Sequence, residues 1–180
     1  HLSSMQAELA TVSDYVDKIA LSHPNIRFVL TNNGSIMLNT DGKGDLLKAI
    51  SNVFGISVAR NMIEINTEDR DYKISGFISK PEINRTTKNH MITLVNGRVV
   101  KNSSINRSIN DSYHTYKPDN RYPIVVLLIS VDPSLIDVNI HPTKMDIKFS
   151  KLEELLALVL KMIKDKLKNQ SLIRDAYIEE

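Results

Sequence analysis

The feature that most constrains the fold is an apolar run from Ile124 to Val131, in which Ser130 is the single polar residue. A half-exposed strand alternates apolar and polar residues. A run without alternation is instead typical of a strand that is covered on both faces or lies at the centre of a sheet. Asp132-Pro133 ends the run. The sequence therefore predicts a central strand in a sheet that other elements cover.

The rest of the chain supplies partners for this strand. Asn33-Gly34 and Asn96-Gly97 predict tight hairpin turns, because both positions of each pair accept a positive φ. Other strands are predicted over 26–32, 35–40, 62–66, 72–79 and 91–95, with a short half-exposed strand that carries Val138 and Ile140. Apolar residues at spacings of three and four predict helices over 2–19, 45–54, 104–114 and 151–168. Asp45 is the expected N-cap of the second helix, and Ser103 or Asn102 that of the third. These elements predict an α+β fold in which a mixed β-sheet packs on helices.

The domain organisation follows from the same pattern. We expect an N-terminal helix, hairpin and short helix over 1–60, a main domain over 61–168 and a tail over 169–180 that is frayed or ordered only by a neighbour. The 180 residues contain no Cys, which excludes a disulfide framework, a thiolate zinc site and a cysteine nucleophile. No apolar run is long enough to span a bilayer, so no membrane partner is expected.

The basic residues are unevenly distributed. Residues 80–121 contain eight Lys or Arg against three Asp or Glu, whereas the whole chain has a net charge of +2. Tyr113, Tyr116 and Tyr122 lie in or directly beside the same stretch. Positive charge interleaved with aromatic rings suits a nucleic-acid surface, although on charge alone a solvated rim is the favoured interpretation.

The segment after the apolar run contains the other polar candidates. Asp137, Asn139 and His141 alternate along one predicted strand face, where a hydrogen-bonded anchor is a simpler interpretation than a metal, so no metal site is predicted. A hydrolase that uses His141 and Asp137 is the least favoured hypothesis. Pro142 restricts the backbone just before Lys144, whose ammonium group could then face a phosphate. Without further context, however, a lysine in a turn is usually exposed to solvent.

Three motifs carry a resemblance to a known family. They are Val95-Asn96-Gly97-Arg98, then Val131-Asp132-Pro133, then the segment from Ile136-Asp137 through His141-Pro142-Thr143-Lys144. Together they resemble the MutL family of DNA mismatch repair proteins, whose signature VDVNVHPTK is matched here with Ile at positions 136 and 140. The resemblance is to the second half of the family's ATPase region, which belongs to the GHKL superfamily together with gyrase B.

The resemblance implies a transducer domain with a fold like domain 2 of a ribosomal protein, including a left-handed βαβ crossover. Residues 1–60 would then be the end of the ATPase domain or a linker from it. ATP and Mg²⁺ are implied for the parent protein and would be bound mostly by the preceding ATPase domain. The fragment itself is expected to hold neither and to be inactive alone. The family's lysine that reaches the γ-phosphate corresponds to Lys144, our candidate catalytic and cofactor-binding residue.

The resemblance also implies partners. These are the protein's own N-terminal ATPase domain, DNA bound weakly and without sequence specificity, the mismatch-recognition protein MutS and a second copy in a homodimer. Lys101 and Arg107 are the candidate DNA-binding residues, with Arg98 less favoured because its turn needs it structurally. A bacterial, nucleoid-associated cytoplasmic protein is implied. The alternative hypothesis is a stand-alone nucleic-acid-binding module of the same fold.

Overall fold

The computed structural model describes residues 2–138 and 145–179, which divide into two compact units, His1–Arg60 and Asn61–Glu180. The smaller unit contains helix α1 (Leu2–Ser22), the hairpin β1 (Val29–Asn32) and β2 (Ser35–Asn39), helix α2 (Leu46–Phe54) and the short helix α3 (Ile56–Ala59). Asn33 and Gly34 both have positive φ, which confirms the first tight turn. Asp45 caps α2, as predicted, by accepting a hydrogen bond from the Lys48 N–H at 3.2 Å.

The predicted apolar stripe of α1 is only partly covered. Met5 and Val12 are 66% and 49% exposed, whereas Leu9, Val16 and Ile19 are half-buried. Ala20 and Leu21, which are buried at the C-terminal end of the helix, are not members of that stripe. Periodicity shows which residues share a helix face, but it does not show how far a partner surface extends along that face.

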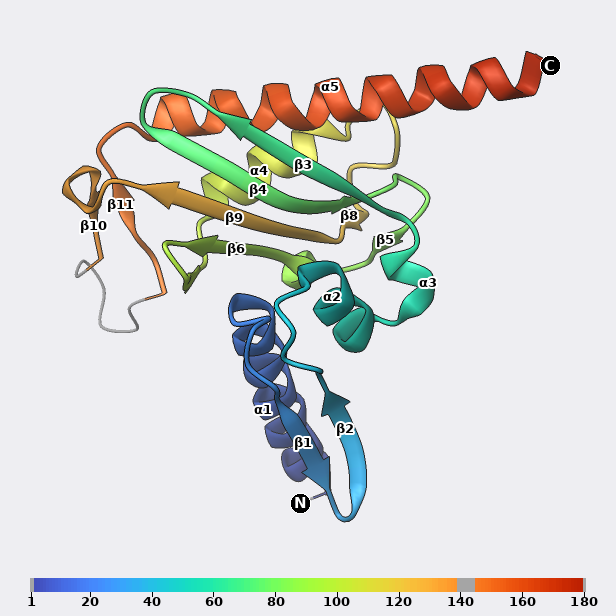
Figure 1. Cartoon of the computed structure of the whole chain (residues 1–180), viewed down its shortest axis with the longest axis vertical. Helices are drawn as coiled ribbons and strands as arrows, with labels where there is room; N and C mark the ends of the chain where they lie inside the picture. Colours follow the sequence, from blue (N-terminus) through green and yellow to red (C-terminus); the bar gives the residue numbers. More distant parts are fainter. Residues whose placement is uncertain (1, 139–144, 180) are drawn as a thin grey trace. The chain divides into compact units, whose positions relative to one another are not determined.

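The larger unit contains the main sheet and the two long helices that cover it. Its elements are β3 (Met62–Glu68), β4 (Tyr72–Ser79), β5 (Asn84–Arg85), the 3₁₀ turn η1 (Lys88–His90), β6 (Met91–Val95), β7 (Arg98–Val100), α4 (Ser103–Ser112), β8 (Tyr122–Pro123), β9 (Val125–Val131), the 3₁₀ turn η2 (Pro133–Leu135), β10 (Ile136–Asp137), β11 (Lys148–Phe149) and α5 (Leu152–Glu179). Five strands form one sheet in the order β3-β4-β9-β6-β7. Figure 1 shows α4 and α5 on the same face of this sheet.

The apolar run is the middle strand of the sheet, as predicted. β9 pairs antiparallel with β4 and parallel with β6, so that Leu127 lies opposite both Gly76 and Thr93. The other pairings within the sheet are antiparallel. The chain leaves β6, passes through β7, α4 and β8, and returns as the parallel neighbour β9, which makes the sheet mixed. The predicted α+β class, with a mixed sheet packed on helices, is confirmed.

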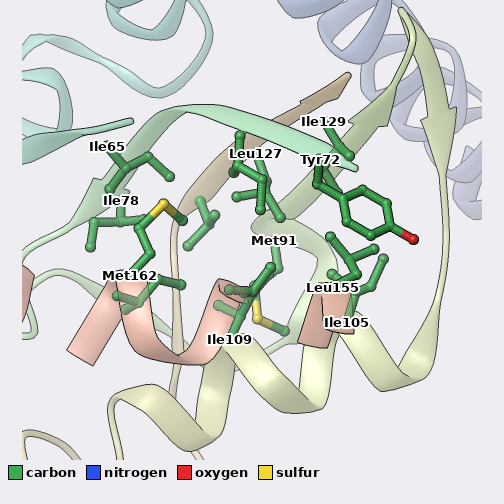
Figure 2. Close-up of a cluster of buried hydrophobic side chains, with 14 of the residues drawn as sticks. Ile65, Tyr72, Ile78, Met91, Ile105, Ile109, Leu127, Ile129, Leu155 and Met162 are labelled. Atoms are coloured by element: carbon green, nitrogen blue, oxygen red, sulfur yellow. The ribbon is translucent and has the colours of Figure 1, made fainter. Parts of the chain in front are cut away.

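The core of this unit lies between the sheet and the two helices. Alternate residues of β9, among them Leu127 and Ile129, project toward Ile105 and Ile109 of α4 and toward Leu155 of α5 (Figure 2). All five side chains are at most 2% exposed. Burying an aliphatic side chain contributes about 1.5–3 kcal/mol, so the packing of α4 and α5 fixes the positions of both helices.

Two predictions about element boundaries are wrong. Helix α5 continues to Glu179, whereas the sequence predicted its end at Lys168 and a frayed tail. The prediction equated the end of the helix with the end of the buried stripe at Leu167, but the following residues contain neither Gly nor Pro. The half-exposed strand predicted at Val138 and Ile140 is instead β10, which ends at Asp137, and Ile140 lies outside the described residues.

Candidate functional site

Lys144, the first candidate residue, lies outside the described residues, as do Asn139 and His141. The segments on either side of it are described. β10 and β11 pair antiparallel, with Ile136 opposite Phe149 and Asp137 opposite Lys148. Ser150 N–H donates to the Leu135 carbonyl at 2.9 Å just beyond this pair. The two strands that flank the segment containing Lys144 therefore pair with each other in one short antiparallel ladder.

The C-terminal side of that segment is also joined to the start of α4. The Lys101 N–H donates to the Met145 carbonyl at 2.6 Å, and Asn102 Nδ2 donates to Asp146 Oδ1 at 3.3 Å. Ile147, the next residue, is 2% exposed in the core. Met145 directly follows Lys144 in the sequence, so the backbone beside the candidate lysine is held by a hydrogen bond.

The side chain of Asn102 forms a second hydrogen bond, to the start of α4. Its Oδ1 accepts the Ile105 N–H at 3.0 Å and so caps α4, which selects Asn102 over Ser103 as the cap. One side chain therefore bonds both the first turn of α4 and the residues after Lys144. The sequence offered Asn102 as one of two candidate caps but gave no sign of the bond to Asp146, because no local signal links positions 44 residues apart.

The candidate DNA-binding residues occupy the exposed side of this region. Arg98 ends the β6–β7 turn, Lys101 lies between β7 and α4, and Arg107 lies on the face of α4 opposite the buried Ile105 and Ile109. All three basic side chains are exposed. Arg107 lines a concavity together with Lys88 and Tyr122, which Arg98 and Lys101 do not line.

Two members of the predicted basic and aromatic surface are buried instead. Tyr113 is 0% exposed, and its hydroxyl donates to the Ser79 carbonyl at 2.5 Å. Lys117 is 8% exposed and donates to Asn110 Oδ1 at 2.5 Å. Burial raises the pKa of Tyr113 well above its ordinary value and lowers the pKa of Lys117, with Asp119 acting in the opposite direction on the lysine. Composition alone could not distinguish these two side chains from the exposed ones.

No group of three or more His, Asp, Glu or Cys side chains able to hold a metal ion is found within residues 2–138 and 145–179. No helix in those ranges is long and apolar enough to cross a membrane.

The chain is similar to known proteins both in sequence and in fold. Residues 50–168 match a family model described as "DNA mismatch repair protein, C-terminal domain". The DNA mismatch repair protein MutL of Streptococcus mutans is 44% identical over 176 residues. That alignment covers 98% of this chain but 27% of the relative, so the chain spans about a quarter of the relative's length.

Solved structures resemble the fold. The crystal structure of an N-terminal domain of a DNA repair protein has a TM-score of 0.79, at 23% sequence identity over 94% of this chain and 56% of that one. The Aquifex aeolicus MutL ATPase domain complexed with ADP has a TM-score of 0.59, at 18% identity over 88% of this chain and 48% of that one. At these identities the likeness concerns the fold alone.

Proposed function

The chain belongs to the MutL family of DNA mismatch repair proteins, and from this premise we propose that it is the transducer domain of a MutL-type ATPase. In this proposal Lys144 contacts the γ-phosphate of ATP, which is held mainly by a preceding ATPase domain. The transducer then couples the nucleotide state to dimerisation and to the binding of DNA and of MutS. Family membership and the likeness to an ATPase-domain fold support this role.

The observation that carries the proposal is the anchoring of Met145. Its carbonyl is bonded to the Lys101 N–H, and the following Asp146 is bonded to Asn102. We infer that this anchor limits the positions open to the preceding lysine, which would lower the entropy lost when its side chain reaches a phosphate. An ammonium group is also a suitable donor for phosphate oxygens.

The chemical contribution of Lys144 is electrostatic. ATP bound with Mg²⁺ supplies the phosphoryl group, and its oxygens carry the charge that the transition state redistributes. The ammonium group of Lys144 stabilises that charge through a positioned positive group. After hydrolysis the contact is lost, and the anchored segment is free to take a second position.

The connection through Asn102 supports the coupling part of the proposal. The same side chain bonds Asp146 and caps α4, the helix that carries Arg107. A shift of Asp146 would therefore be transmitted to the first turn of α4 and to Lys101. Through this connection we expect the state of the γ-phosphate to alter contacts made by Lys101, Arg107 and Arg98 with DNA.

Steady-state ATPase kinetics of the full-length protein test the proposal, with Lys144→Ala compared with wild type after equal folding has been verified by circular dichroism. We expect kcat to fall about 100-fold while KM changes little, because the interaction acts on the transition state. Lys148→Ala is the matched control, since it removes the same charge from an exposed position on β11. Wild-type kinetics in the Lys144 variant, or equal losses in both variants, would overturn the assignment.

A further inference from the structure

The concavity beside Arg107 has features that the proposed DNA contacts leave unexplained. It has a volume of about 210 Å³ and is formed by η1, β6, α4 and β8. Lys88, Arg107 and Tyr122 line it, together with the amide side chains of Asn106 and Asn110. Residues from four separate elements thus converge on one hollow, which local sequence could not have predicted.

The charges around this concavity are predominantly positive. Lys88 and Arg107 are both exposed, and within the described residues neither forms an ion pair. Lys88 Nζ lies 5.7 Å from the centroid of the Tyr122 ring, a distance at which the ring attracts the ammonium group. Asp111 is the one acidic residue among those that line the concavity.

A third cation lies behind the wall. Lys117 Nζ is 5.9 Å from the centroid of the Tyr122 ring and donates to Asn110 Oδ1, so it contacts two residues that line the concavity. It also donates to the carbonyls of Pro118 and Arg121, and these bonds hold the buried ammonium in one position. A fixed buried charge acts over several ångströms with little screening by solvent. It therefore adds to the positive potential in front of Tyr122.

We propose that Lys88 and Arg107 together bind one backbone phosphate of DNA in this concavity, so that Lys88 is a further DNA-contacting residue. This inference rests on the proposed DNA binding. Two cations and the side-chain amide N–H groups of Asn106 suit the charge and the acceptor oxygens of a phosphodiester, whereas Asn110 Nδ2 donates to the Asp119 carbonyl at 3.1 Å. The negative charge of Asp111 lowers the affinity of the concavity for a small free anion. DNA binds nevertheless in this proposal, because Lys101 and Arg98 hold neighbouring phosphates of the same strand.

Salt-dependent DNA binding by the full-length protein tests the proposal, with fluorescence anisotropy of a labelled oligonucleotide duplex as the measurement. We expect Lys88→Ala to weaken binding about 5-fold to 10-fold at low salt and Lys88→Arg to restore most of it. Because both cations hold the same phosphate, the double variant Lys88→Ala/Arg107→Ala should reduce the salt slope by about 0.9, the value of one phosphate contact. A reduction of about twice that value would mean two separate contacts and would overturn the shared site.

Two controls separate this inference from the proposed function. Lys161→Ala removes the same charge from an exposed position on α5, and equal losses in Lys161→Ala and Lys88→Ala would overturn the site. Weaker binding by Lys101→Ala with unchanged binding by Lys88→Ala would overturn the inference while leaving DNA binding intact. No binding by the wild type would overturn both. Inorganic phosphate, compared with chloride at equal ionic strength, should not compete with DNA, and specific competition would assign the site to free phosphate instead.

Discussion

Gly76 offers a stringent test of how the sheet is assembled. It lies in β4 opposite Leu127 of the central strand, with a φ of +128° that side chains with a Cβ rarely adopt. A Cβ added there would lie 2.0 Å from the Val126 carbonyl oxygen and 3.1 Å from the Val126 carbonyl carbon. The colliding atoms belong to the backbone, so rotation of a side chain cannot relieve the contact. Gly76→Ala must therefore separate β4 from β9.

The expected magnitude has two parts. A non-glycine residue in this region of φ costs about 1–3 kcal/mol. Moving the Cβ from 2.0 Å to the 3.0 Å limit of real contacts displaces the backbone by about 1 Å, which weakens neighbouring hydrogen bonds worth about 1 kcal/mol each and loosens the packing of Leu127. We expect a total loss of about 4 kcal/mol, a large share of the roughly 5–15 kcal/mol by which domains are stable.

Hydrogen exchange of peptides that cover β9 measures this loss within the larger unit, whatever the smaller unit does. We expect Gly76→Ala to reduce protection about a thousand-fold, because each factor of ten corresponds to about 1.4 kcal/mol. Gly97→Ala is the matched control: its φ is +82° and nothing lies within 4 Å of the added Cβ, so about 1 kcal/mol and a loss of about five-fold are expected. Equal losses of protection in the two variants would refute the collision as the cause.

Three further predictions concern buried and half-buried polar groups, each measured by urea unfolding. Tyr113→Phe should lower the free energy of unfolding by about 1–2 kcal/mol because the Ser79 carbonyl loses its donor, and an unchanged value would contradict this role. Lys117→Met should cost about 2–3 kcal/mol by leaving Asn110 and two carbonyls without a donor. Because burial lowers the pKa of Lys117 in the folded protein, the unfolded chain binds more protons, and the stability of wild type relative to this variant should rise as the pH approaches 10.5; a falling difference would contradict it. Burial and then Asp14 raise the pKa of Asp17 from 3.8 to about 6, so wild-type stability should fall as the pH rises through this window. Asp17→Asn should then be more stable by about 1 kcal/mol at pH 7, after allowance for screening of the half-exposed carboxyl, and equally stable near pH 4.

The candidate site was only partly predictable from the sequence. Resemblance to the MutL family selected Lys144 and Arg107, and helical spacing placed Arg107 on the exposed side of α4, opposite Ile105. The contribution of Lys88 was not predicted, because it lies 19 positions before Arg107 in a different element. Lys117 was counted with the exposed cations, since residue type does not show that three acceptors surround its ammonium group.

Short stretches of sequence predicted the features whose stability depends on residues close together in the chain. The apolar run of β9, interrupted by Ser130 alone, predicted a central strand because a strand at an edge or surface of a sheet usually alternates apolar with polar residues. Asn33-Gly34 and Asn96-Gly97 predicted their turns because a positive φ is a property of two adjacent residues. Asp45 was predicted as a cap, and Asn102 as one of two candidate caps, because a capping side chain bonds an N–H only three residues ahead of it. None of these features depends on distant parts of the chain.

Tertiary structure alone decided the features that join distant residues. The bond between Asn102 and Asp146, the close approach of Gly76 to Val126 and the convergence of Lys88 with Arg107 all arise from the order in which strands enter the sheet. That order depends on the summed burial of many side chains in one core, and no single segment encodes it. The sequence by itself therefore determined the elements and the family, whereas packing around β9 determined which polar groups meet.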